Sequence, residues 1–210
     1  MKNNDAVSLP VVRRLPRYYR FLCELKKSGI VRISSKELAK QMNLTASQIR
    51  QDLNCFGGFG QQGYGYNVDQ LSNEIEQILC LDDNLPTILI GVGNLGRALS
   101  SFLFEAKGIR LIGLFDKNPK SISEHNPELD VMSIARLDEF CAENAPKLAI
   151  LCIPSEHAQS MAEKLVSLGI EGFWNFSHVD LRLDSSISVE NVHLTDSLMT
   201  LCYNTHKKNK

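Results

Sequence analysis

The chain has 210 residues, of which 43% are hydrophobic and 22% charged, and its formal net charge is -1. Such a composition is ordinary for a globular protein of one or two domains. No apolar run approaches the roughly 20 residues of a membrane-spanning helix, and six scattered cysteines without a CxxC pair argue against a zinc site. The N-terminus lacks the pattern of a secretion signal, so we expect a cytoplasmic protein with reduced thiols and neither membrane nor metal as a partner.

Charge is unevenly distributed along the chain. Residues 1–66 contain eleven Lys or Arg and four acidic residues, a balance of +7, which leaves -8 on the remainder. A basic head on an acidic body is typical of a phosphate-binding module joined to a second domain.

The first predicted helix follows a mixed polar segment. Residues 1–15 show no clear period, and we interpret them as a mobile arm. From Pro16 the apolar residues recur with the helical period up to Gly29, a residue that commonly follows a helix end. The pattern therefore predicts a helix that begins near Pro16 and stops before Gly29.

Two short helices are predicted next, because Ser34-x-x-Glu37 and Thr45-x-x-Gln48 both have the spacing of a capping box. Asn43, between them, tolerates the left-handed backbone that a tight turn requires. This spacing is typical of a helix-turn-helix, and a plain helical hairpin satisfies it equally well, so both remain open.

The segment from Phe56 to Tyr66 interleaves five glycines with four aromatic residues. Each interior glycine costs a helix about 1 kcal/mol, so a β-hairpin packed on the helices is the better interpretation. The N-terminal region is then a winged helix-turn-helix. Asn67 is positioned to cap a further helix that ends at the break of residues 82–84.

From residue 85 strand and helix patterns alternate, which predicts an α/β domain built on a parallel sheet with helices on both faces. Strands are expected at 87–92, 110–115, 147–153, 171–175 and near 187–193. Helices are expected at 95–106, 137–144, 156–168 and 195–203.

The strongest chemical signal is a G-x-G-x-x-G motif that follows the first of these strands and opens a helix. Gly91 permits the tight turn, Gly93 lets the backbone approach a pyrophosphate, and Gly96 lets the helix pack closely on the strand. The helix N-terminus offers its N–H groups to the phosphates. This context predicts a Rossmann-type doubly wound sheet whose loop residues bind a dinucleotide, namely Gly91, Val92, Gly93, Asn94, Leu95 and Gly96.

An acidic residue, Asp116, ends the second predicted strand, 25 residues after Gly91. A carboxylate there accepts hydrogen bonds from a ribose 2′-hydroxyl and repels a 2′-phosphate, which favours NAD over NADP. The adjacent Lys117 softens that preference. The alternative is a Rossmann-like domain that binds no nucleotide.

The ends of two later strands supply further candidate cofactor-binding residues, because ligands of open α/β sheets bind at the carboxyl edge. Ile153 ends one predicted strand and is followed by Pro154 and Ser155, and Asn175 ends the next strand and is followed by Phe176. These residues either cover the nicotinamide or only turn the chain, and the sequence leaves both open.

Catalysis is not expected, because a dehydrogenase needs a positioned acid or base and a substrate anchor, usually from a further domain. Here the chain ends almost as soon as the Rossmann unit is complete. His157 and His178 are the nearest candidates, and neither has a carboxylate partner at an informative spacing. Binding without turnover is the better account.

With a winged helix before a dinucleotide-binding unit, the chain resembles the Rex family of redox-sensing repressors. The resemblance runs over nearly the whole chain and is carried by 15–20 (LPRYYR), 34–39 (SSKELA), 48–53 (QIRQDL), 56–60 (FGGFG), 63–66 (GYGY), 91–96 (GVGNLG), Phe115-Asp116 with Pro119, and 172–176 (GFWNF). It implies a homodimer that exchanges its C-terminal helix, and repression at inverted-repeat operators that NADH relieves. The implied domains are 1–84, 85–194 and 195–210.

The resemblance also implies the DNA contacts. Residues 46–53 would form the recognition helix in the major groove, and the hairpin tip would lie toward the minor groove. Chemically, Arg50 suits guanine or phosphate and Gln48 suits adenine, while surface cations supply phosphate contacts. The predicted DNA-binding residues are Arg13, Arg14, Ser35, Lys36, Thr45, Ala46, Gln48, Arg50, Gln51, Gln61, Gln62 and Tyr64, and Lys40 is a further candidate phosphate contact.

Several positions depart from the family's pattern. The wing tip carries Gln61-Gln62 where Lys or Arg is usual, and residues 177–180 (SHVD) replace a small residue followed by Pro-Val-Arg. Arg20 is kept at the family's interdomain switch, but Phe102 and His193 stand where the resemblance implies Tyr and Asp. Phe lacks the hydroxyl donor, and neutral His cannot replace a carboxylate paired with Arg.

We therefore expect a dimeric DNA-binding repressor that senses NADH relative to NAD⁺. The alternatives are an NAD-dependent dehydrogenase with an appended helical domain, and a DNA-binding relative whose nucleotide response is altered or lost. Cys55, beside the recognition helix, is interpreted as a buried structural thiol.

Overall fold

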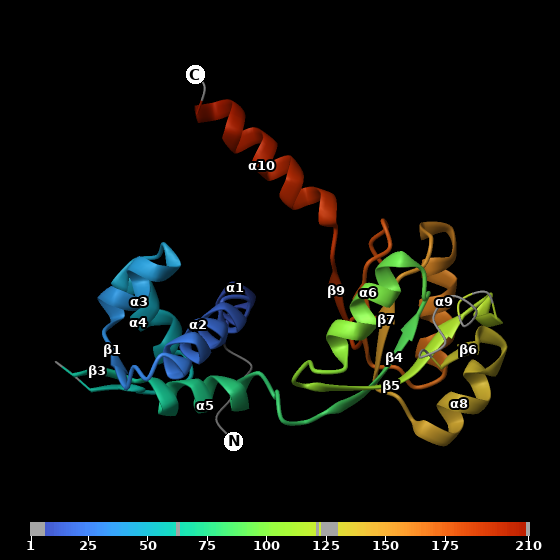
Figure 1. The fold of residues 1–210 in the computed structure, drawn as a ribbon, viewed down its shortest axis with the longest axis horizontal. Helices are drawn as coiled ribbons and strands as arrows, with labels where there is room; N and C mark the ends of the chain where they lie inside the picture. Colours follow the sequence, from blue (N-terminus) through green and yellow to red (C-terminus); the bar gives the residue numbers. More distant parts are fainter. Residues whose placement is uncertain (1–6, 62–63, 121, 123–129, 209–210) are drawn as a thin grey trace. The chain divides into compact units, whose positions relative to one another are not determined.

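The computed structural model describes residues 7–61, 64–120, 122 and 130–208, with the side chains of 61 and 208 excluded. Its contacts divide the chain into two compact units, Met1–Asp82 and Asp83–Lys210, and each is described by itself below (Figure 1). We call them the N-terminal unit and the α/β unit.

Helices dominate the N-terminal unit. Its elements are α1 (Leu9–Val12), α2 (Leu15–Lys27), β1 (Arg32–Ile33), α3 (Ser35–Met42), α4 (Ala46–Asn54), β2 (Gly60–Gln61), β3 (Gly65–Asn67) and α5 (Val68–Ile78). The expected mobile arm is wrong for its second half, because α1 is helical and Val11 and Leu15 are buried. This segment is too short for its apolar residues to show a helical period, so the sequence pattern missed the helix that their burial stabilises.

The predicted helix-turn-helix is present. Ser34 accepts a hydrogen bond from the Glu37 N–H while the Glu37 carboxylate accepts one from the Ser34 N–H, so the capping box is complete. Thr45 caps α4 through the N–H of Gln48. Asn43 lies between α3 and α4 with φ 53° and ψ 46°, the left-handed conformation that its type favours.

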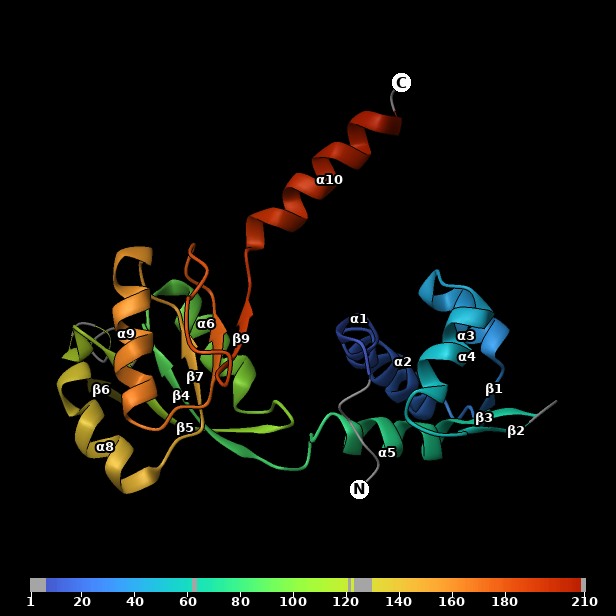
Figure 2. The same cartoon turned by 180° about the vertical axis from the view of Figure 1, so that it is seen from behind.

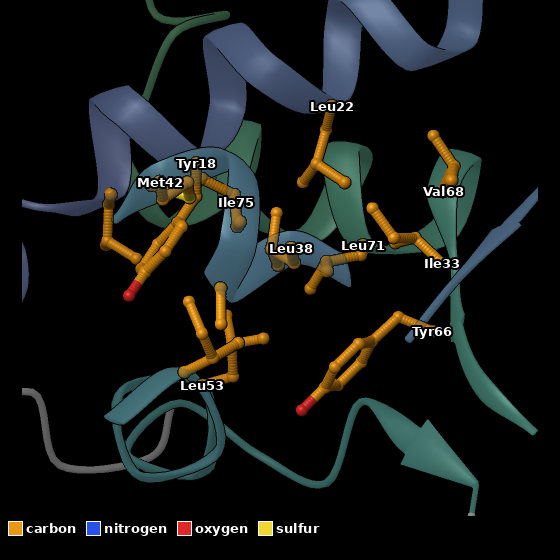
Figure 3. Packing of buried hydrophobic residues seen from close by; sticks show 13 residues of the cluster. Tyr18, Leu22, Ile33, Leu38, Met42, Leu53, Tyr66, Val68, Leu71 and Ile75 are labelled. Atoms are coloured by element: carbon orange, nitrogen blue, oxygen red, sulfur yellow. The ribbon is translucent and has the colours of Figure 1, made fainter. Parts of the chain in front are cut away.

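A small antiparallel sheet of order β1-β3-β2 forms the wing. The sequence patterns missed β1, a two-residue edge strand that pairs with β3. Gly65 has φ +70°, and a Cβ there would lie 2.5 Å from the carbonyl oxygen of Ile33, so only glycine fits. Tyr66 and Ile33 from this sheet join the buried cluster shown in Figure 3, together with Tyr18, Leu38 and Leu71 from the helices.

The α/β unit has the strand order of a doubly wound dinucleotide-binding fold. Its elements are β4 (Leu85–Ile90), α6 (Asn94–Leu103), β5 (Ile109–Asp116), β6 (Val131–Ser133), η2 (Ile134–Arg136), α8 (Leu137–Asn144), β7 (Leu148–Leu151), α9 (Ser155–Ser167), β8 (Gly172–Asn175), β9 (Ser188–Asn191) and α10 (Leu194–Lys208). The order β6-β5-β4-β7-β8-β9 is parallel throughout, which is 3-2-1-4-5-6 in chain order. The patterns missed β6 and η2, both three residues long.

Helices cover both faces of this sheet (Figure 2), and alternate residues of the strands are buried against opposite faces. Ile88 and Ile90 pack with residues of α8 and α9, whereas Leu89 packs on the other face with residues of α6. Helix α10 begins three residues after β9, and every described side chain in it is exposed. It is also longer than the predicted 195–203.

Candidate nucleotide site and nucleic-acid interface

The loop between β4 and α6 is built around two glycines whose side-chain positions are already occupied. Gly91 has φ +95°, and a Cβ there would lie 2.4 Å from the carbonyl oxygen of Cys152. A Cβ on Gly96 would lie 1.9 Å from the carbonyl oxygen of Gly91. Helix α6 therefore packs against the loop at a separation that no other residue type permits.

Gly93 differs, because nothing lies within 4 Å of a Cβ built on it. It is the N-cap of α6, and both Gly93 and Asn94 are exposed, whereas Leu95 is half-buried and Val92 is buried. The first-turn N–H groups of a helix have no partner within the helix, and the positive end of its dipole lies beside them. The space over Gly93 therefore fits an anionic pyrophosphate, as the sequence motif predicts.

Asp116 lies at the carboxyl end of β5, beside the glycine loop. Its Oδ2 accepts a hydrogen bond of 2.9 Å from the Val92 N–H, and its Oδ1 accepts one of 2.9 Å from the Asn118 N–H. Each carboxylate oxygen retains acceptor capacity for a ribose hydroxyl. Lys117, the next residue, is exposed.

The carboxyl end of β7 also reaches the glycine loop. Ile153 is half-buried, and its Cγ2 would lie 2.7 Å from a Cβ on Gly91. Pro154 is the N-cap residue of α9, and it is exposed, as is Ser155. Ile153 and Pro154 therefore lie at the edge of the sheet where the loop could hold a dinucleotide.

Asn175 is a correction to the predicted cofactor contacts. Its side chain is fully buried, its Nδ2 donates to the carbonyl of Val179 and to Oδ1 of Asn191, and its Oδ1 accepts from the N–H and hydroxyl of Ser177. Because these bonds use its polar atoms, Asn175 holds the loop after β8 in shape instead. The neighbouring Phe176 is half-buried and packs edge-on against Trp174, with ring centroids 4.7 Å apart.

Helix α4 and the residues around it present polar side chains to solvent. Thr45, Arg50 and Gln51 are exposed, Ala46 is half-buried, and Arg50 Nη1 donates to Oγ of Ser35 at 3.1 Å. Lys36 and Lys40 are exposed on the preceding helix, as is Arg13 near the end of α1. The Gln61 side chain and all of Gln62 lie outside the described residues.

Arg14, a predicted phosphate contact, has its guanidinium in an internal ion pair. Its Nε and Nη2 donate to the two carboxylate oxygens of Asp52 at 2.6 and 2.7 Å. Asp52 is 1% exposed, so this pair joins the start of α2 to α4 inside the N-terminal unit. Arg14 therefore has a structural role inside the N-terminal unit, and its contact with a phosphate stays a prediction.

Arg32, in strand β1 of the wing, contacts Tyr64 in a way that the sequence did not predict. Its Nη1 donates to the carbonyl of Tyr64 at 3.3 Å, and its guanidinium carbon lies 5.9 Å from the centroid of the Tyr64 ring. Tyr64 is 72% exposed. A cation stacked on an aromatic ring of the wing adds positive charge near the predicted minor-groove contacts.

The predicted switch residues belong to different units. Arg20 is exposed on α2 of the N-terminal unit, whereas Phe102, which is 66% exposed, and His193 belong to the α/β unit. His193 Nε2 lies 2.8 Å from Oδ1 of Asp180, and this hydrogen bond raises the pKa of the imidazole. The carboxylate partner of His193 had no signal in the sequence, because Asp180 is 13 residues away in a loop.

Metal ligands, membrane-spanning helices and thiols are three further features of the described part of the chain. No group of three or more His, Cys, Asp or Glu residues there has the arrangement of a metal site. Helices long and apolar enough to cross a membrane are likewise absent from the residues described. Cys55 is exposed, which corrects its interpretation as a buried thiol, whereas burial raises the pKa of Cys152 to about 12.

Comparisons with known families and proteins match both units. Residues 6–54 match the family model described as "Putative DNA-binding protein N-terminus", and residues 82–179 match the one described as "CoA binding domain". A protein of Caldanaerobacter subterraneus subsp. tengcongensis named "Redox-sensing transcriptional repressor Rex" is 51% identical over 209 residues, which cover 99% of this chain and 93% of that protein. The protein of the same name from Clostridium botulinum strain Eklund 17B is 44% identical over 209 residues, covering 99% and 100%.

Solved structures are similar over the same length. "Crystal structure of RSP in complex with beta-NAD+ and operator DNA" has a TM-score of 0.87 and 48% identity, covering 98% of this chain and 95% of that one. "Crystal structure of RSP in complex with beta-NADH" has a TM-score of 0.86 and 45% identity, with coverage of 98% and 97%.

Proposed function

Since the chain belongs to the Rex family of redox-sensing transcriptional repressors, we propose that it binds operator DNA through α4 and the wing, and that NADH at the glycine loop releases the DNA. One observation carries this proposal: the chain joins a helix-turn-helix to a glycine loop with the open space and helix N-terminus of a dinucleotide site. The ligands are NAD⁺ and NADH, as in the RSP complexes.

The proposed DNA contacts lie on α4, around it and on the wing of the N-terminal unit. Helix α4 enters the major groove with Thr45, Ala46, Gln48, Arg50 and Gln51. Ser35, Lys36 and Arg13 approach the phosphates, and the wing residues Gln61, Gln62 and Tyr64 lie toward the minor groove. Gln48 and Arg50 are the base-reading candidates, because their amide and guanidinium groups match adenine and guanine edges.

A homodimer is the working unit. Helix α10 exposes the apolar side chains of Leu194, Leu198, Met199, Leu201 and Tyr203, each at least 57% accessible. A helix with so much exposed apolar surface needs a partner, and a second copy also supplies the two-fold symmetry that an inverted-repeat operator requires. We infer that α10 is exchanged between subunits. The proposed division is a DNA-binding domain at 1–84, a nucleotide domain at 85–194 and the exchanged helix and tail at 195–210.

Binding without turnover is part of the proposal. The relatives are repressors, and His157 and His178, the nearest candidate acids or bases, are exposed side chains rather than members of a built site. A repressor of chromosomal operators works in the cytoplasm. The switch then needs only that NADH binds the released arrangement more tightly than the DNA-bound one, because a ligand shifts an equilibrium through its differential affinity.

The test is fluorescence anisotropy of a labelled inverted-repeat operator at fixed salt, with NADH and NAD⁺ titrated separately. We expect NADH to release the DNA at concentrations where NAD⁺ does not. The matched control is Gly93→Ala, which adds a methyl group to open space at the nucleotide loop and should bind DNA but ignore NADH. DNA binding that neither nucleotide changes would show that the nucleotide switch has been lost or retuned, and oxidation of NADH during the titration would indicate an enzyme.

A further inference from the structure

Asp52 is a buried carboxylate on the proposed recognition helix. Its Oδ2 accepts from Nε of Arg14 at 2.6 Å and from the hydroxyl of Tyr18 at 2.7 Å. Its Oδ1 accepts from Nη2 of Arg14 at 2.7 Å and from Nε2 of Gln48 at 2.8 Å. A carboxylate has about four acceptor sites, so these four bonds use all of them.

The charge on Asp52 is retained despite burial. Burial alone would raise its pKa, but the hydrogen bonds from Arg14, Tyr18 and Gln48 outweigh it and hold the pKa below the usual value. A charged carboxylate only accepts hydrogen bonds. Whatever part of Gln48 faces Asp52 must therefore be a donor.

The amide of Gln48 consequently has one permitted orientation. Its Nε2 donates to Asp52, and turning the amide over would place Oε1 against a carboxylate oxygen at hydrogen-bonding distance. Two acceptors cannot satisfy each other, and an unsatisfied charged group in a buried place is costly. Oε1 and the second hydrogen of Nε2 remain for another partner, and Gln48 is half-buried rather than covered.

We propose that Asp52 is a positioning residue for base recognition: its hydrogen bond fixes which end of the Gln48 amide donates and which accepts at the DNA surface. The proposal rests on α4 being the recognition helix. Glutamine pairs with adenine by accepting from N6 and donating to N7, whereas guanine presents acceptors at both O6 and N7. An amide that cannot turn over keeps Oε1 as an acceptor and so rejects guanine at the position that it reads.

The arrangement of partners separates this role from simple anchoring. Arg14, the N-cap residue of α2, already neutralises Asp52, and together with Tyr18 of α2 it ties α4 to that helix. The bond from Gln48 spans one turn within α4, so it adds no connection between elements. This hydrogen bond therefore acts on the orientation of the Gln48 amide alone.

The first experiment compares base preferences of the full-length protein. Operators with each base pair of the half-site replaced in turn are titrated with wild type, Gln48→Ala, Asp52→Asn and the double variant. An asparagine at 52 can accept from Gln48 or donate to it, so the amide can turn over. Wild type should discriminate roughly 5- to 100-fold at one base pair, and both single variants should reduce the discrimination at that pair to within about 3-fold of unity. The double variant should lose nothing more there.

Asp69→Asn is the matched control, because Asp69 is an exposed acid paired with Lys26 at 2.9 Å and the same charge is removed. It should leave all base preferences unchanged. If Asp52→Asn weakens binding to every sequence by the same factor while Gln48→Ala changes one position, Asp52 is only structural and the inference fails. If Gln48→Ala changes no position, or wild type does not bind the operator, the proposed recognition by α4 is wrong, and this inference with it.

A second measurement does not depend on the variant folding. In ¹⁵N-labelled wild type, the side-chain amide of Gln48 is assigned by its loss in Gln48→Ala, and its hydrogen exchange is compared with that of the exposed neighbour Gln51. We expect one Gln48 amide hydrogen to exchange at least several-fold more slowly than either of Gln51. Equal exchange of the two side chains would overturn the inference.

Discussion

The imidazole Nε2 of His193 lies 2.8 Å from Oδ1 of Asp180, and this contact ties the start of α10 to the loop that follows β8. The carbonyl of His193 accepts from the N–H of Asp196, so His193 adjoins the first turn of the helix. The His193 side chain is 26% exposed and that of Asp180 74%. Two positions that depart from the family's pattern therefore contact each other.

The contact between His193 and Asp180 should make the stability of the start of α10 depend on pH. The hydrogen bond with Asp180, with a smaller contribution from the charge of Asp196, raises the pKa of His193. Below the ordinary histidine value near 6.5 the stabilisation is fully present, and it is lost as pH rises through the raised pKa. An NMR titration of the His193 ring should show this shift, and Asp180→Asn should reverse most of it. Identical titration curves for the two proteins would contradict this expectation.

Gly93 and Gly96 should respond differently to the same added methyl group. Gly96→Ala forces its Cβ against the Gly91 carbonyl and should lower the melting temperature measured by circular dichroism. Gly93→Ala enters open space and should melt like wild type, yet lose NADH binding by calorimetry because the methyl group occupies the path of the pyrophosphate. Tight NADH binding by Gly93→Ala would place the nucleotide elsewhere.

Asp116 should set the preference between NADH and NADPH. Asp116→Asn removes the charge, keeps an oxygen for the Val92 N–H, and should weaken NADH binding roughly 10- to 100-fold, because a hydrogen bond to a charged group contributes about 1.5–3 kcal/mol. The ratio of NADH to NADPH affinity should narrow as well. Lys117→Ala is the neighbouring control, expected to weaken NADPH more than NADH. Equal losses for both nucleotides in Asp116→Asn would mean that Asp116 only shapes the loop.

Substitutions of Arg14 and Lys36 should have different effects, because Arg14 is expected to stabilise the fold and Lys36 to contact a phosphate. Arg14→Ala leaves the buried Asp52 with fewer partners and should lower the free energy of unfolding by about 1.5–3 kcal/mol. Its salt dependence of operator binding should match wild type. Lys36→Ala should leave stability unchanged and reduce the slope of log K against log salt by about 1. A reduced salt slope for Arg14→Ala would show that Arg14 also contacts a phosphate.

Local signals predicted the fold well. The capping box at Ser34, the left-handed Asn43 and the cap at Asn67 each depend on residues within a few positions, so the sequence reveals them directly. The glycine loop is equally local, and the sheet order confirms the Rossmann-type fold that it predicts. Helix α8 begins and ends where its periodicity predicts.

Tertiary contacts account for most of what the sequence did not reveal. Arg14 looks like any surface cation until Asp52, 38 residues later, is brought beside it. Asn175 ends a strand where ligands bind, and only the folded loop shows that its amide is used internally. Cys55 was predicted to be buried, and the fold leaves it exposed. Such pairings depend on the path of the chain, which no spacing of residue types specifies.

The position of Trp174 gives this protein an optical property. It is the one tryptophan in the sequence, half-buried and packed edge-on against Phe176 in the same unit as the glycine loop. Reduced nicotinamide absorbs where indole emits, and oxidised nicotinamide does not. Excitation of Trp174 should therefore transfer energy to NADH and not to NAD⁺. The unmodified protein would report the redox state of its own ligand as lower tryptophan emission and higher nicotinamide emission.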